Sequence, residues 1–327
     1  MTTRRHLVSL LALPAILGAM ALPHVAVAQT FPSKAIRLVV PFGAGGVADL
    51  TARTVAQKLS ESLGQPVLVD NRPGAGGVVA GDLVAKSDPD GHTLLLMSNG
   101  TAVSAGLFKS LPFDTLRDFA PVSTLGFFDI AIITQGDSKF KTLPDLLVYA
   151  RANPGKLNIG SINIGSTQNL AAELFKSSAG VDMQIVPFNG SPAVITALRG
   201  NQIDAAVEIL APVLPQINAK ALRALAVTGA KRASVLPDVP TAKESGVANF
   251  EAASWNAIAA PAKTPKSVIA RLNKEITAAL NSPDVKKRLA DQNVAAQAST
   301  PEQASELLAS EVKRWGDVIV RAKVPQQ

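Results

Sequence analysis

The residues best placed to do chemistry lie in two glycine-rich segments that resemble each other. One is PFGAGGV at 41–47 and the other is RPGAGGV at 72–78, each between a predicted strand and a predicted helix. Backbone N–H groups of residues without side chains can approach a ligand closely, and a helix N-terminus adds partial positive charge. This predicts a site for a carboxylate or phosphate oxygen. The first candidate ligand-binding residues are Phe42, Gly43, Ala44, Gly45, Gly46 and Gly76.

Two further loops that lead into predicted helices carry polar side chains, GSINIGST at 160–167 and PFNGSP at 187–192. Their hydroxyl groups either cap the helices or face a ligand. Asp49, in the first turn of its helix, either complements the helix dipole or contacts the ligand. Phe42 and Phe188 either pack on the carbon skeleton of a ligand or are ordinary core residues. The remaining candidates are Asp49, Ser98, Ser161, Asn163, Gly165, Ser166, Thr167, Phe188, Asn189 and Glu208.

Residues for covalent or metal-assisted catalysis are scarce. There is no cysteine, and the three histidines are His6, His24 and His92. His92 follows the turn signal Asp88-Pro89-Asp90-Gly91, which predicts a surface turn. No Gly-x-Ser-x-Gly elbow accompanies it. We therefore predict that the protein is not an enzyme and that it has no catalytic residue, no metal site and no cofactor.

A dinucleotide site is a competing interpretation of the first glycine loop. Residues 43–48 fit the pattern Gly-x-Gly-x-x-Ala, and Asp70 lies where a ribose-binding acid is expected. A second glycine loop follows Asp70 at once, which that pattern does not require, and no partner for hydride transfer stands out. These observations favour a simple anion site over a nicotinamide cofactor.

The elements that position these loops alternate short apolar strands with helical patterns. We predict strands at 36–41, 66–69, 93–97, 157–160, 183–186, 203–209 and 222–227. Helices are expected at 48–63, 77–86, 143–152, 167–178, 192–199, 212–219, 265–280, 283–292 and 301–322. Two extended segments, 121–134 and 255–261, are expected to cross between two units.

This alternation predicts an α/β protein of two lobes, each an open, mainly parallel sheet flanked by helices and joined by two crossing strands. Lobe 1 would contain residues 29–125 and 258–327, and lobe 2 residues 126–257. Such a fold closes around a ligand held between its lobes.

The first 28 residues are typical of a cleaved signal peptide. Arg4 and Arg5 precede an uncharged apolar run, and Ala26-Val27-Ala28 predicts cleavage after Ala28. Removing the two arginines lowers the formal charge from +7 to +5. The only dense basic cluster, at 286–288, fits a solvated helix face, so we predict no nucleic-acid partner.

At these loops the sequence resembles the substrate-binding receptors of the tripartite tricarboxylate transporters, often called Bug receptors. The similarity covers the whole mature chain and is carried by IRLVVPFGAGGVAD (36–49), VDNRPGAGG (69–77), GSINIGSTQNLAAELF (160–175), VPFNGSPAVITALRGNQID (186–204), LRALAVTGAKRASVLPDVPTAKES (222–245) and WNAIAAPAKTP (255–265).

The resemblance implies a periplasmic-binding-protein fold of type II, a periplasmic location and no catalytic activity. It implies a small ligand such as a mono- or dicarboxylate, an amino acid or an aromatic acid. The loops matching 42–46 and 160–167 would hold a carboxylate through backbone groups and bridging waters. The implied partner is a membrane permease of two subunits, a sensor protein is a second possible partner, and the receptor would be a monomer.

Four positions depart from the pattern of this family. Asn163 stands where glycine is usual and Asn169 where histidine is usual. Glu208 replaces a common aspartate, and Asn189 replaces a frequent basic residue. We hypothesise that Asn189 and Glu208 tune the pocket away from a simple dianionic ligand. Two alternatives remain open: a ligand sensor without a transport role, and an exported α/β enzyme built on His92.

Overall fold

The computed structural model describes residues 31–321 and 324–327. The predicted signal peptide, residues 1–28, lies outside this part of the chain. None of the described helices is long and apolar enough to cross a membrane.

The first group of strands contains β1 (Ile36–Val40), β2 (Val67–Asn71) and β3 (Thr93–Ser98), with β1 in the centre and all three parallel. They are connected through α1 (Val47–Leu63), the short 3₁₀ helix η1 (Ala75–Gly77) and α2 (Val78–Ala85), and α3 (Asn99–Leu107) follows β3. Nearly every residue of β1 and β3 is buried. Their continuous apolar runs are therefore those of parallel strands covered on both faces.

The second group of strands is built in the same way. It contains β5 (Asn158–Ile162), β6 (Gln184–Phe188) and β7 (Ala205–Ile209), and β5 pairs in parallel with both of the others. The helices are α4 (Leu143–Ala152), α5 (Thr167–Ala179), α6 (Ser191–Arg199) and α7 (Leu210–Asn218). The strand β8 (Leu222–Val227) pairs with β4 rather than with this parallel set.

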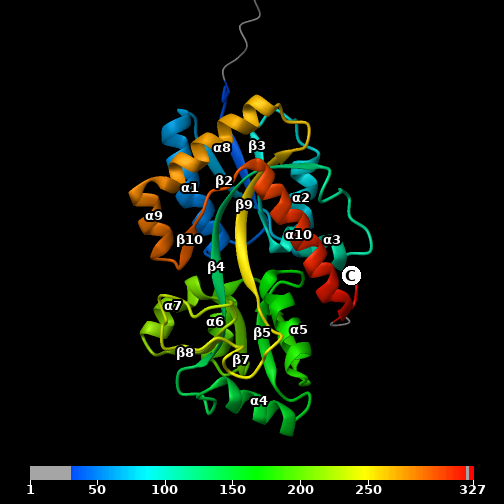
Figure 1. Cartoon of the computed structure of the whole chain (residues 1–327), viewed down its shortest axis with the longest axis vertical. Coiled ribbons are helices and arrows are strands. Elements are labelled where there is room, and N and C mark those ends of the chain that lie inside the picture. Colours follow the sequence, from blue (N-terminus) through cyan, green and yellow to red (C-terminus); the bar gives the residue numbers. More distant parts are fainter. Residues whose placement is uncertain (1–30, 322–323) are drawn as a thin grey trace, which may run out of the picture. The chain divides into compact units, whose positions relative to one another are not determined.

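Two long strands join the two groups into one sheet. β4 (Phe119–Gln135) and β9 (Ala253–Pro261) pair antiparallel from Phe119 to Asp129. The strand order is β2-β1-β3-β9-β4-β7-β5-β6, and β8 and the short β10 (Val294–Ala296) also pair with β4. Figure 1 shows β4 and β9 running between the two groups. The predicted α/β fold is confirmed, and the antiparallel pairing of β4 and β9 makes the sheet mixed.

The C-terminal helices return to the first group of strands. α8 (Lys266–Asn281) and α9 (Pro283–Ala290) pack against α1, and α10 (Pro301–Arg321) packs against α3 and β4 (Figure 1). Trp315 of α10 is fully buried, and its indole N–H donates to Glu311 at 2.8 Å. The last helix therefore forms part of the core around the first strands of the chain.

Candidate functional site

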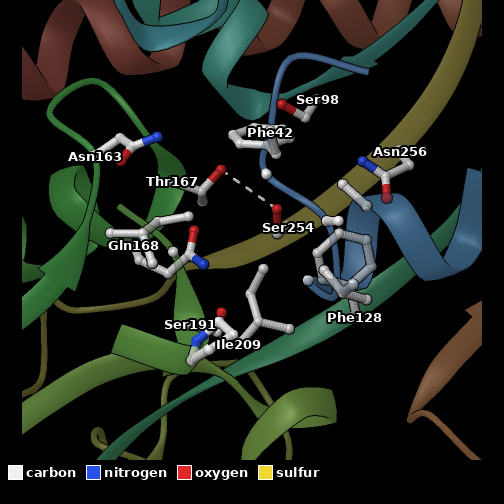
Figure 2. Close-up of a pocket in the computed structure, with 18 of the residues that line it drawn as sticks. Phe42, Ser98, Phe128, Asn163, Thr167, Gln168, Ser191, Ile209, Ser254 and Asn256 are labelled. Carbon is white, nitrogen blue, oxygen red and sulfur yellow. Dashed lines mark hydrogen bonds between the residues drawn. The ribbon is translucent and has the colours of Figure 1, made fainter. Parts of the chain in front are cut away.

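A cavity lies at the carboxyl ends of five strands, β1 and β3 of the first parallel group and β5, β6 and β7 of the second, beside β4 and the start of β9 (Figure 2). This is where ligands bind in open α/β sheets. None of the described residues that line it is charged. They are Phe42, Gly43, Ala44, Gly46, Val47, Ala48, Ser98, Phe128, Ile162, Asn163, Thr167, Gln168, Asn189, Gly190, Ser191, Pro192, Ile209, Ser254 and Asn256.

Five helices begin at this cavity. The N-terminal capping residues of α1, α3, α6 and α7 line it, and so does Thr167, the first residue of α5; the four caps are Gly46, Ser98, Gly190 and Ile209. The first N–H groups of a helix have no partner within it, and they carry the positive end of the helix dipole. Helix N-termini that point at an uncharged cavity favour the binding of an anion.

Asp49 stabilises the conformation of the first glycine loop from the side that faces away from the cavity. Its buried carboxylate accepts hydrogen bonds from the Gly45 N–H (3.0 Å), Asn71 (2.9 Å) and Arg53 (3.0 Å). Burial alone would raise the pKa of Asp49, but the hydrogen bonds from Arg53, Gly45 and Asn71 outweigh it, and the pKa lies below its ordinary value. Asn71 also donates to the Phe42 carbonyl at 3.0 Å. Asp49 therefore braces the loop and does not line the cavity.

The third loop divides its polar groups between its own structure and the cavity. Ser166 caps α5 by accepting from the Asn169 N–H at 3.1 Å. The Asn169 side chain accepts from the Gly165 N–H and donates to Ser161, both at 3.3 Å. Asn163 and Thr167 line the cavity, and Thr167 accepts a hydrogen bond from Ser254 of β9 at 3.3 Å (Figure 2).

Glu208 lies fully buried behind the wall of the cavity. Its Oε1 accepts from Gln168 Nε2 and from the Ile209 N–H, both at 2.8 Å, and its Oε2 has no hydrogen-bond partner among the described residues. Burial raises the pKa of Glu208 to about 7, against the opposing effect of its polar neighbours Gln168, Ile209 and Ser191. These three neighbours all line the cavity.

Half of the residues predicted from the sequence line the cavity: Phe42, Gly43, Ala44, Gly46, Ser98, Asn163, Thr167 and Asn189. Other predicted residues do not line the cavity but form hydrogen bonds that hold its loops in place. They are Gly45, Asp49, Ser161, Gly165, Ser166 and Glu208. Gly76 and Phe188 line a neighbouring depression, which shares Asn163 and Asn189 with the cavity.

Several residues that line the cavity were not predicted from the sequence. Val47, Gly190, Ser191 and Pro192 lie inside the predicted loops, and Ala48 directly follows one of them, so all five could have been included with the loops. Gln168 directly follows the candidate Thr167, and Ile209 directly follows the candidate Glu208. Ile162, the last residue of β5, lies inside the predicted loop 160–167. Phe128, Ser254 and Asn256 lie within strands, where no local pattern marks a cavity residue.

The predicted surface position of His92 is wrong. His92 is buried, its Nε2 accepts from the Ser33 N–H at 3.2 Å, and its ring meets Phe31 edge-on at 5.1 Å. The turn before β3 folds back over the start of the described chain, which covers the imidazole. His92 therefore packs residues 31–33 against the first strands. No group of three His, Asp or Glu side chains that could hold a metal occurs among the described residues.

An anion-attracting cavity at the strand ends of two α/β groups, which two long strands connect, defines a solute-binding protein. Residues 51–324 match the sequence model of the family described as "Tripartite tricarboxylate transporter family receptor". The chain belongs to this family and is a receptor of this type. The resemblance inferred from the glycine loops is confirmed.

The chain is similar to several known proteins. Protein BugT of Bordetella pertussis is 37% identical over 294 residues, which cover 89% of this chain and 90% of BugT. The structure of Rhodopseudomonas palustris Rpa4515 with adipate has a TM-score of 0.86 at 33% identity, covering 90% of this chain and 98% of that one. MatC from the same organism, with bound malate, has a TM-score of 0.83 at 32% identity, covering 88% and 100%.

Proposed function

We propose that the chain is a periplasmic receptor that captures a small organic acid in this cavity and delivers it to a membrane permease of two subunits. The observation that carries the proposal is the uncharged cavity at which five helices begin. The adipate and malate held by the two relatives support an acid as the ligand. The family of the chain supports the permease as its partner.

The carboxylate binds to backbone N–H groups rather than to a basic side chain. Val47 and Ala48 in the first turn of α1 offer such groups on one side of the cavity, and Thr167 and Ser191 at the starts of α5 and α6 offer them on the other. Fixed dipoles of this kind bind an anion without the cost of burying a counter-charge. Two opposed sets of donors also suit an acid with polar groups at both ends.

The ligand is compact. The centre of a water molecule can move through a volume of about 40 Å³ in the cavity. This is room for a few water molecules or a short carbon chain. Phe42, Phe128, Ile162 and Ile209 supply the apolar part of the lining. These side chains pack against the carbon skeleton while the helix N-termini hold its polar ends.

Capture occurs by closure of two lobes, residues 29–125 with 258–327 and residues 126–257, about a hinge in β4 and β9. Loops of the two strand groups meet at the cavity, since a Cβ added to Gly43 would lie 3.7 Å from the carbonyl oxygen of Asn189. A ligand that contacts both loops stabilises the closed arrangement over the open one.

The test begins with protein purified from the periplasm, where a mass corresponding to residues 29–327 checks export and cleavage. Mono- and dicarboxylates, amino acids, aromatic acids and NAD are then screened by thermal shift and calorimetry. An acid that raises the melting temperature and is recovered intact supports the receptor. A shift with NAD alone, turnover of a ligand, or no shift with any acid contradicts it.

Ala44 offers a matched pair of variants for the position of the carboxylate. It is exposed and lines the cavity beside the start of α1. Ala44→Asp adds a negative charge there, and Ala44→Asn adds the same shape without the charge. We expect Ala44→Asp to weaken binding about tenfold more than Ala44→Asn because like charges repel at short range. Equal effects of the two variants would place the carboxylate elsewhere.

A further inference from the structure

Gln168 is a cavity residue whose side-chain amide is held in one orientation by a buried neighbour. Its side chain is almost fully buried and reaches the cavity from the first turn of α5 (Figure 2). Its Nε2 donates to Glu208 Oε1 at 2.8 Å. Its Oε1 accepts no hydrogen bond from any described residue and is not among the atoms closed off from solvent. The amide therefore presents an acceptor to the ligand.

Glu208 fixes this orientation of the Gln168 amide. Glu208 Oε1 already accepts from the Ile209 backbone N–H at 2.8 Å, so this oxygen is an acceptor whether or not the carboxyl group is ionised. A proton on Glu208 resides on Oε2, which has no described hydrogen-bond partner. A flipped Gln168 amide would set its own oxygen against Oε1, which is repulsive. Only the observed orientation lets Gln168 Nε2 donate to Glu208 Oε1.

We propose that Gln168, positioned by Glu208, selects acids that carry a hydrogen-bond donor, a hydroxyl or an ammonium group, on the carbon chain beside the carboxylate. This inference rests on the proposed function, because it concerns the same cavity. An unsubstituted acid would place a methylene group against the amide oxygen and leave a buried acceptor without a partner. Sites built for a hydrogen bond reject analogues that lack it more strongly than sites built for apolar contact.

The charge around Gln168 reinforces this choice. None of the residues that line the cavity has a positively charged side chain that could attract the amide oxygen of Gln168. The Glu208 carboxyl group lies one hydrogen bond behind the amide and polarises it, so that the oxygen facing the cavity is a stronger acceptor. A second carboxylate in this position would meet an acceptor instead of a donor, whereas an ammonium or hydroxyl group would be stabilised.

The first experiment compares acids of equal length by calorimetry, using the length that binds best in the screen. At four carbons the set is succinate, malate and aspartate; at three carbons it is propionate, lactate and alanine. We expect the hydroxyl or amino acid to bind at least about tenfold more tightly than the unsubstituted acid. Unsubstituted acids that bind within threefold of both others overturn this inference and leave the receptor standing. Failure of every acid overturns both.

Variants at the two positions separate selection from structural support. Gln168→Met keeps a similar volume but removes the acceptor, and we expect the tenfold preference to disappear. Glu208→Gln keeps an acceptor at Oε1 and should retain the preference. Glu208→Leu frees the amide to rotate and should lose it, in protein whose circular dichroism shows a folded chain. A preference that persists in Gln168→Met, or that Glu208→Gln abolishes, contradicts the assignment.

Discussion

Glu208 and Asp49 are two buried carboxyl groups whose pKa values lie on opposite sides of their ordinary values. Both lose hydration on burial, but Asp49 gains the Arg53 guanidinium and the N–H groups of Gly45 and Asn71, whereas Glu208 gains only neutral donors and keeps one oxygen unpaired. The number and charge of the donors decides the direction of each shift. The two residues therefore affect stability in opposite ways as pH changes.

For Glu208 we expect stability to fall as pH rises. Its pKa is raised from 4.5 to about 7 in the folded protein, so the folded state binds more protons than the unfolded state between these values. The free energy of unfolding should fall by roughly 3 kcal/mol from this group between those two pH values. Glu208→Gln should lack this loss. Urea unfolding of both proteins at pH 5, 6, 7 and 8 measures it, and a difference that stays constant with pH would contradict the raised pKa.

For Asp49 we expect removal of the carboxylate to loosen the first glycine loop. Asp49→Ala breaks the bonds to Gly45, Asn71 and Arg53 and should lower the free energy of unfolding by about 2 kcal/mol. Ligand affinity should also fall, although Asp49 does not line the cavity. Ser62→Ala, at an exposed position on the same helix, serves as the control and should leave affinity unchanged. Unchanged affinity in Asp49→Ala would show that the first glycine loop keeps its shape without the Asp49 carboxylate.

At the scale of elements, the loops before α2 and α5 and the first turn of α3 contact one another through glycines. A Cβ added to Gly165 would lie 3.3 Å from the Gly76 Cα and 3.1 Å from Leu107, and one added to Gly100 would lie 3.6 Å from the Gly165 carbonyl. Gly165 also has a φ of +82°, which favours glycine. Backbone from both strand groups therefore comes into contact directly beside the cavity.

We expect a methyl group at Gly165 to weaken ligand binding by hindering this contact. Gly180, at the other end of the same helix, is the matched control because its φ is +61° and nothing lies within 4 Å of an added Cβ. Both Gly165→Ala and Gly180→Ala should lose about 1 kcal/mol of stability from backbone strain. Only Gly165→Ala should lose affinity, by about tenfold if the strain of the contact is near 1.4 kcal/mol. Calorimetry and urea unfolding separate the two effects.

The sequence predicted most helices and strands of this fold because their apolar patterns and glycine stops are local. It missed α3, whose sequence NGTAVSAGL lacks a helical pattern and begins through a cap between Ser98 and Thr101. It also missed β10, whose three residues form a strand only by pairing with β4. The loop residues of the cavity were predictable from glycine and hydroxyl patterns. Phe128 and Asn256 were not, because their place depends on how β4 and β9 pair.

At the scale of the whole described molecule, β4 and β9 join the two groups of strands into one sheet, and both strands contribute residues to the cavity. β9 pairs with β3 on one side and β4 on the other, and β4 continues to β7 and β8. Trp255 lies in β9 between Ser254 and Asn256, both of which line the cavity, and its indole N–H has no partner among the described residues. Its surroundings therefore report on both the cavity and the crossing strands.

We expect ligand binding to change the fluorescence of Trp255. Trp315, the other tryptophan of the sequence, lies in α10 with its indole N–H bonded to Glu311 and should not respond. The change should persist in Trp315→Phe and disappear in Trp255→Phe. Small-angle scattering on the same samples measures closure directly as a smaller radius of gyration. A response that follows Trp315 would argue against movement at the crossing strands.

The strand pairing also orders events during synthesis of the chain. Leu95 of β3 pairs with Ala259 of β9, and α10 covers α3, so β3 and α3 lack these two partners until most of the chain has left the ribosome. At ordinary rates of translation this delay is on the order of ten seconds. Pairings between residues so distant in sequence also form slowly. A nascent chain in which β3 has not yet paired with β9 is not fully folded and can still pass through a secretion channel. This fits the secretion predicted from residues 1–28.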